Sequence, residues 1–170
     1  MIDPKVREAA LADADAIRRV AERGWKATYG HILPTETIDT ALDEWYTVDG
    51  TRAAIEREDI GYFVAERAGD VVGYVSGGST DEDGVAVLGA IYVDPNCWNE
   101  GIGTALLETF ETFCREQGDE TIRFRVLSEN DVGASFYKRH GYEVAETEET
   151  DLFGETVLED AYRGQIDESR

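Results

Sequence analysis

Two glycines, Gly101 and Gly103, have the spacing of a loop that binds phosphate at the start of a helix. They follow an apolar run over residues 85–93 and open a stretch with helical periodicity. Backbone N–H groups at a helix start have no partner within the helix, and the helix dipole adds about half a positive charge there. Such a terminus binds phosphate without a basic side chain. A tight strand-to-helix turn that binds nothing would fit the same spacing.

Two classes of phosphate ligand do not match this loop. No Gly-Lys-Ser/Thr sequence follows the glycines, so it is not a nucleoside triphosphate loop. A dinucleotide fingerprint needs a third glycine, where this chain has Leu106. A nucleotide-binding oxidoreductase is therefore excluded.

The elements that position this loop follow from periodicity and turn residues. The pattern predicts a mixed α/β chain with antiparallel hairpins at both ends and one βαβ unit between them. We expect strands at 6–9, 62–66, 71–75, 85–93 and 121–127, and two more within 142–162 that turn at Phe153-Gly154. We expect helices from near Asp13 to Gly24, from 34 or 35 to about 46, from Ile102 to Gly118, and from about 131 to 140.

Two segments together resemble the GNAT family of acyl-CoA-dependent N-acyltransferases. The first is residues 88–107, LGAIYVDPNCWNEGIGTALL, which is similar to that family's main cofactor motif. The second is VLSEN at 126–130 followed by ASFYKRHGY at 134–142, which is similar to its second motif. The resemblance covers nearly the whole chain. It implies one N-acetyltransferase domain, residues 1–170, built on a twisted, mixed, mostly antiparallel sheet of six or seven strands flanked by about four helices.

The resemblance also implies the reaction and its residues. An amine attacks the thioester of acetyl-CoA directly, with no covalent enzyme intermediate and no metal, so Cys97 and Ser135 are not nucleophiles. Tyr137 would protonate the leaving thiolate, although a tyrosine packed on a helix fits too. Asn130 would contact the cofactor, or it is a plain helix N-cap. The implied cofactor-binding residues are Ile91, Tyr92 and Val93 for the pantetheine arm, Asn99, Glu100, Gly101, Ile102, Gly103 and Thr104 for the diphosphate, and Asn130 and Tyr137.

Several positions depart from the family pattern. Trp98 stands where arginine or glutamine is usual, and Asn99 replaces a common glycine. Glu100 would repel the CoA phosphates, which predicts weak binding at low salt that improves as salt screens the charge. Val87 stands where many relatives carry a glutamate base, so the base is left unassigned. Trp98, Glu100 and Val87 support an alternative, a catalytically weak CoA-binding sensor or regulatory module.

Possible stand-ins for the base are Glu36, Asp39 and Asp43, which a solvated helix face explains equally well. The acceptor pocket is expected at Trp25 through Pro34, with Trp25, Tyr29 and His31 as candidate substrate-binding residues. Core packing would also explain the two aromatic side chains. The acceptor is a primary amine of a small molecule or of a peptide, such as a polyamine, an aminoglycoside or a protein N-terminus.

Charge and composition restrict the setting. The chain has 37 acidic and 16 basic residues, a net charge of −21, spread over every segment. Such a surface opposes nucleic-acid binding and is typical of a halophilic host, although an ordinary acidic bacterial protein fits too. No apolar run would cross a membrane and residues 1–5 show no signal-peptide stretch, so we expect a cytoplasmic protein, monomeric or homodimeric. Two cysteines and two histidines predict neither disulfides nor a metal site.

Overall fold

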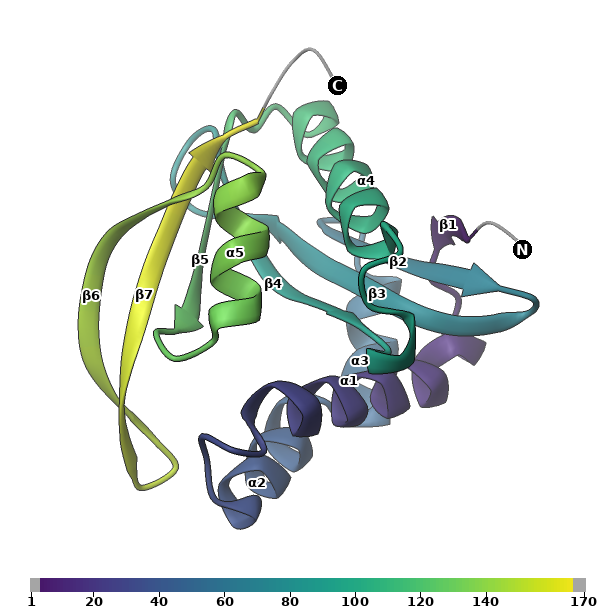
Figure 1. Ribbon diagram of the computed structural model, residues 1–170. Helices are drawn as coiled ribbons and strands as arrows, with labels where there is room; N and C mark the ends of the chain where they lie inside the picture. Colours follow the sequence, from purple (N-terminus) through teal and green to yellow (C-terminus); the bar gives the residue numbers. More distant parts are fainter. Residues whose placement is uncertain (1–3, 167–170) are drawn as a thin grey trace.

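One seven-stranded sheet organises the described residues, 4–166, of the computed structural model. The strand order is β1-β2-β3-β4-β5-β7-β6, and all neighbours are antiparallel except β4 and β5 (Figure 1). The strands are β1 (Lys5–Glu8), β2 (Ile60–Arg67), β3 (Asp70–Ser79), β4 (Val85–Val93), β5 (Thr121–Leu127), β6 (Glu143–Leu152) and β7 (Glu155–Gln165). This order confirms the expected mixed, mostly antiparallel α/β fold.

Helices cover both faces of the sheet, α4 and α5 on one and α1 to α3 on the other (Figure 1). Successive strand side chains point to opposite faces, so Phe63 and Val75 pack with α4, whereas Val64 and Tyr74 pack with α1 and α2. The helices are α1 (Ala14–Tyr29), α2 (Thr35–Trp45), α3 (Val48–Glu56), α4 (Ile102–Glu116) and α5 (Asp131–Arg139), with short 3₁₀ turns at Leu11–Asp13 and Pro95–Cys97.

Strands β4 and β5 separate after a short paired stretch. Only Val85–Val87 pairs with Thr121–Arg123, and the strands then diverge (Figure 1). A bulge contributes, because the β3–β4 register skips Gly89 between the partners of Ser76 and Gly77, and bulges bend a strand. The β4 backbone beyond Val87 therefore has an edge without a strand partner, facing the gap to β5.

Two sequence expectations about the helices were wrong. Helix α1 does not end at Gly24 but continues to Tyr29. Gly24 is buried there, and a Cβ on it would lie 2.9 Å from Cδ1 of Tyr92, so this glycine serves close packing rather than helix termination. Helix α3 was not expected, because VDGTRAAIE has a weak apolar pattern. Thr47 caps it by accepting a hydrogen bond from the Gly50 N–H at 3.0 Å.

Candidate active site

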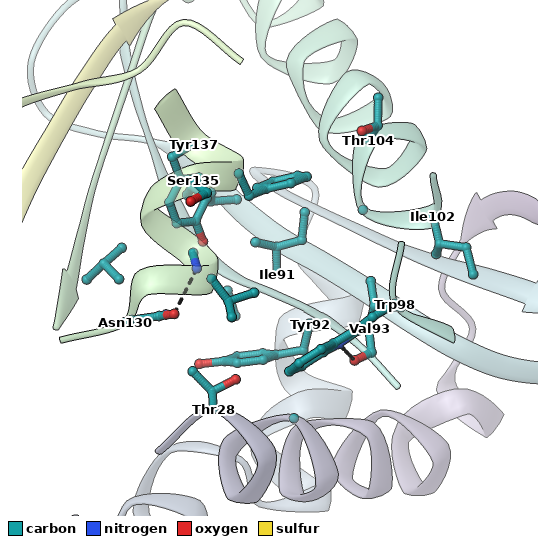
Figure 2. A pocket seen from close by; sticks show the side chains of 18 of the residues that line it. Thr28, Ile91, Tyr92, Val93, Trp98, Ile102, Thr104, Asn130, Ser135 and Tyr137 are labelled. Carbon is teal, nitrogen blue, oxygen red and sulfur yellow. Dashed lines mark hydrogen bonds between the residues drawn. The ribbon is translucent and has the colours of Figure 1, made fainter. Parts of the chain in front are cut away.

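Two adjoining cavities meet in the gap between β4 and β5. The first, about 410 Å³, lies among β4, β5, α4 and α5 and is called here the α4–α5 cavity (Figure 2). The second, about 480 Å³, lies on the α1–α3 side and is called the aromatic cavity. Both volumes are typical of small-molecule sites. Residues that line both cavities are Tyr29, Gly89, Ala90, Tyr92, Arg125 and Val126.

The start of α4 forms one end of the α4–α5 cavity. Gly101, at φ +83°, is the left-handed N-cap, and Asn99 also has a positive φ of +65°. The first helical hydrogen bond runs from the Ala105 N–H to the Gly101 carbonyl, so the amides of the preceding turn remain available. Gly101, Ile102, Gly103 and Thr104 all line the cavity. The expected anion-binding loop therefore opens into this cavity.

Glu100 is placed differently from its neighbours. It does not line the α4–α5 cavity, and its carboxylate pairs with Arg67 at 3.0 Å. The expectation that this charge simply opposes the CoA phosphates needs correction, because the guanidinium offsets much of it. Sequence reasoning missed Arg67, which is 33 residues away along the chain.

Trp98 links the loop to the end of β4. Its Nε1 donates to the Val93 carbonyl at 2.9 Å, shown as a dashed line in Figure 2, and its ring lines the cavity. Beside it, Ile91, Tyr92 and Val93 line the cavity. Their β3 side is paired, whereas their other side faces the gap. That edge can accept an extended chain with amide groups, as an added strand would.

Arg125 and Arg139 are the charged side chains that line the α4–α5 cavity, and among the described residues no carboxylate does. Arg139, in the last turn of α5, lies 5.9 Å from the Phe136 ring centroid. Sequence reasoning missed both arginines, although Lys138-Arg139 was visible as a basic pair at a helix end. In a chain of charge −21, this lining favours an anionic ligand.

Asn130 has two structural roles. Its Oδ1 accepts from the Gly133 N–H at 2.8 Å, which caps α5, and its Nδ2 donates to the Tyr29 hydroxyl at 3.2 Å. Asn130 also lines the α4–α5 cavity. The N-cap interpretation is confirmed, and the hydrogen bond ties α1 to α5 across the gap. Burial raises the pKa of Tyr29 to about 12, so its hydroxyl stays protonated at physiological pH.

Tyr137 projects from α5 into the α4–α5 cavity (Figure 2). It is 9% exposed, and its ring centroid lies 4.4 Å from that of Phe124. Burial raises its pKa well above the usual phenol value, because water no longer stabilises the phenolate. Tyr137 is thus neutral at physiological pH and lies beside the gap.

Aromatic side chains of α1 and α2 form much of the second cavity. Trp25 and Tyr29 line it, with ring centroids 4.7 Å apart, together with Trp45 and Tyr46. His31 does not belong with them. It is exposed and lines neither cavity, because α1 extends to Tyr29 and places the following turn beyond the site.

The candidate bases do not reach either cavity. Glu36, Asp39 and Asp43 are exposed on α2 and line neither one, as expected for a solvated helix face. Val87 lies in the paired part of β4, before the gap opens. The ionisable groups that line the aromatic cavity are Arg125 and Glu159 among the described residues, apart from the phenols.

A family model described as the acetyltransferase (GNAT) family matches residues 19–142. The chain belongs to the GNAT family. It is an N-acetyltransferase, and acetyl-CoA donates the acetyl group to an amine. The available amides at α4, the free edge of β4 and a lining to which the described residues contribute no carboxylate all fit the coenzyme.

Individual relatives agree with this assignment. The chain is 27% identical over 159 residues to a spermidine N(1)-acetyltransferase of Thermoplasma acidophilum, covering 91% of this chain and 98% of that one. The structure is similar to that of the PaiA N-acetyltransferase of T. acidophilum in complex with coenzyme A, with TM-score 0.80, 26% identity, and 93% and 98% coverage. It shares its fold with Ard1 of Thermoplasma volcanium, with TM-score 0.75, 24% identity, and 97% and 99% coverage.

Proposed function

We propose that acetyl-CoA lies in the α4–α5 cavity and that the acceptor amine enters through the aromatic cavity. The diphosphate would lie on the amides of residues 99–104, and the pantetheine arm along Ile91, Tyr92 and Val93. The thioester would then reach the gap between β4 and β5. The observation that carries the proposal is that the two cavities share six lining residues at that gap.

Tyr137 would act as the general acid. The acceptor nitrogen forms a bond to the thioester carbon, the carbon–sulfur bond breaks, and the thiolate takes the Tyr137 proton. Placing both reactants in one gap supplies the orientation that the bimolecular step needs. The phenol then recovers a proton from solvent, and the proton lost by the amine leaves through water, since Val87 offers no base.

The acceptor is proposed to be a small amine. The relative of 27% identity is named a spermidine acetyltransferase, and the aromatic cavity of about 480 Å³ has room for a ligand of that size. Thr51 and Ser76 add hydroxyl groups to its wall.

The setting of the enzyme is also a proposal. One sheet carries both apolar cores, which supports a single domain over residues 1–170. In the described residues, no helix is long and apolar enough to cross a membrane, and we propose a cytoplasmic location. The charge of −21 supports a host with concentrated internal salt. Unfolding curves at rising KCl would test the last point, since equal stability at low and multimolar salt argues against it.

Turnover tests the function directly. Purified protein is mixed with acetyl-CoA and a panel of amines, and a thiol reagent reports CoA release. Tyr137→Phe is expected to lower kcat about a hundredfold or more, as for loss of a general acid, while the dissociation constant for CoA changes little. Coenzyme binding with no CoA release on any amine would instead favour the sensor module. Release at an undiminished rate in Tyr137→Phe would remove the proposed acid.

A further inference from the structure

The aromatic cavity offers ring faces on several sides. Trp25 of α1 lies 6.0 Å from Trp45 and 6.2 Å from Tyr46, measured between ring centroids, and Tyr46 lies 6.3 Å from Tyr92 of β4. All four rings, and Tyr62 of β2, line the cavity. Such a wall suits methylene groups, and aromatic ring faces also attract ammonium groups.

Glu159 supplies a negative charge to this wall that is not fully neutralised. Its partner Arg125 lies 3.7 Å away. The same guanidinium is also approached by Glu148 at 3.2 Å and Glu146 at 3.8 Å, both on β6. Three carboxylates around one guanidinium leave an excess of negative charge. Of the three, only Glu159 lines the cavity.

The position of Glu159 is close to the reacting gap. It pairs in register with Leu127 at the end of β5. The raised pKa of Tyr29 arises mainly from burial, and the negative charge of Glu159 is among the smaller causes that add to it. Tyr29 lines both cavities. A cation held at Glu159 would therefore lie on the acceptor side of the gap.

Trp45, which lines the aromatic cavity, contacts the turn between β6 and β7. Trp45 ends α2, and Phe153 lies in that turn, with ring centroids 5.2 Å apart. Figure 1 shows this turn beside α2. Leu152, next to Phe153, lines the cavity. The end of α2 and the β6–β7 hairpin therefore both border the cavity.

We infer that the acceptor is a linear aliphatic amine with a second cationic centre, a di- or polyamine, and that Glu159 determines this specificity by holding the second ammonium group. The inference rests on the proposed function of the same site. The rings hold the methylene chain, and the reacting amine, in its neutral form, points into the gap. A monoamine of equal length would lack only the contact with Glu159.

The test compares 1,4-diaminobutane with butylamine in wild type, Glu159→Gln and Glu148→Gln. Glu148→Gln is the matched control, because this carboxylate also pairs with Arg125 but does not line the cavity. We expect Glu159→Gln to raise KM for the diamine about tenfold or more, as for loss of a charged hydrogen bond. In Glu159→Gln, the kcat for the diamine, its pH profile and the kcat and KM for butylamine should stay near the wild-type values. In Glu148→Gln, all of these constants and the KM for the diamine should stay near the wild-type values.

Three results would overturn the inference. One is equal kcat/KM for diamine and monoamine in the wild type. Another is a KM for the diamine that Glu159→Gln leaves unchanged. The third is a loss of kcat for both amines with an altered pH profile, which would make Glu159 a base rather than an anchor.

Calorimetry of 1,4-diaminobutane with the CoA-loaded protein separates this inference from the proposed function. If CoA binds and no amine is acetylated, the proposed function fails. The role of Glu159 in holding an ammonium group is then still decided by binding. It stands if wild type binds the diamine about tenfold or more tightly than Glu159→Gln does, and it falls if the two bind it equally.

Discussion

Replacing Gly101 with alanine should weaken coenzyme binding by an amount set at least by backbone strain. Gly101 has φ +83°, and a Cβ built there has no protein heavy atom within 4 Å. No steric clash with the protein therefore contributes. A non-glycine residue in the left-handed region costs about 1–2 kcal/mol. If the loop relaxes to relieve that strain, its amides move away from the position that binds the diphosphate. Binding must then restore the strained conformation, and this cost lowers the affinity. We expect the dissociation constant for CoA to rise about 5–30-fold.

Gly118 offers the matched control. It follows the other end of α4, has φ +92°, and also has no heavy atom within 4 Å of an added Cβ. Gly118→Ala carries the same strain but lies outside the α4–α5 cavity. Urea unfolding should show a loss of up to about 1–2 kcal/mol in either variant. Only Gly101→Ala should lose affinity for CoA by calorimetry.

A truncated donor makes the assay sharper. Acetylpantetheine lacks the diphosphate, so its kcat/KM should be the same in wild type and Gly101→Ala. Wild-type affinity for CoA in Gly101→Ala would refute the assignment of the loop to the diphosphate. An equal loss with acetylpantetheine would show that Gly101 acts through some other part of the coenzyme.

Three further predictions concern charge, protonation and packing. Burial raises the pKa of Tyr137, and a general acid works only while it is protonated. The kcat should therefore not fall near pH 10, where a free phenol titrates. A fall of kcat at that pH in a pH–rate profile would contradict this. Arg67→Gln leaves Glu100 without its partner and should weaken CoA binding several-fold at low KCl. The loss should disappear near 1 M KCl, where the Debye length is about 3 Å. A loss of affinity that calorimetry finds to be independent of salt would count against this prediction. Gly24→Ala would place a Cβ 2.9 Å from Tyr92 Cδ1 and should lower kcat/KM about tenfold. The intrinsic stability of the helix should rise at the same time by up to about 1 kcal/mol, because alanine has a higher helix propensity than glycine. Unchanged kinetics would mean that the Tyr92 ring can move aside without effect on the reaction.

The coenzyme side of the site follows closely from the sequence. The apolar run at 85–93, the glycines and the next helix are contiguous, so local rules fix their order and their approximate ends. The structure places Gly101, Ile102, Gly103 and Thr104 in the α4–α5 cavity. Whether these residues bind CoA stays a prediction until ligand binding is measured.

The acceptor side was largely beyond sequence reasoning. Its wall combines residues of α1, α2, β4, β5 and β7, from Trp25 to Glu159, and no local pattern links them. Gly24 was misleading because the same residue type ends helices and permits close packing. His31 was misleading because a longer α1 moved its turn away from the site. Glu159 had no distinguishing signal in a chain where acids are everywhere.

Charge is sorted across the gap in a way that the total of −21 conceals. On the proposed coenzyme side, Arg139 lines the cavity, no carboxylate of the described residues does, and Arg67 offsets Glu100 nearby. On the acceptor side, Glu159 faces a cavity whose one guanidinium is shared with β6. An anionic donor and a cationic acceptor would therefore each meet a complementary wall. Because Arg125 and Arg139 are exposed and salt screens exposed charges, this sorting would act mainly at low ionic strength and weaken in concentrated salt.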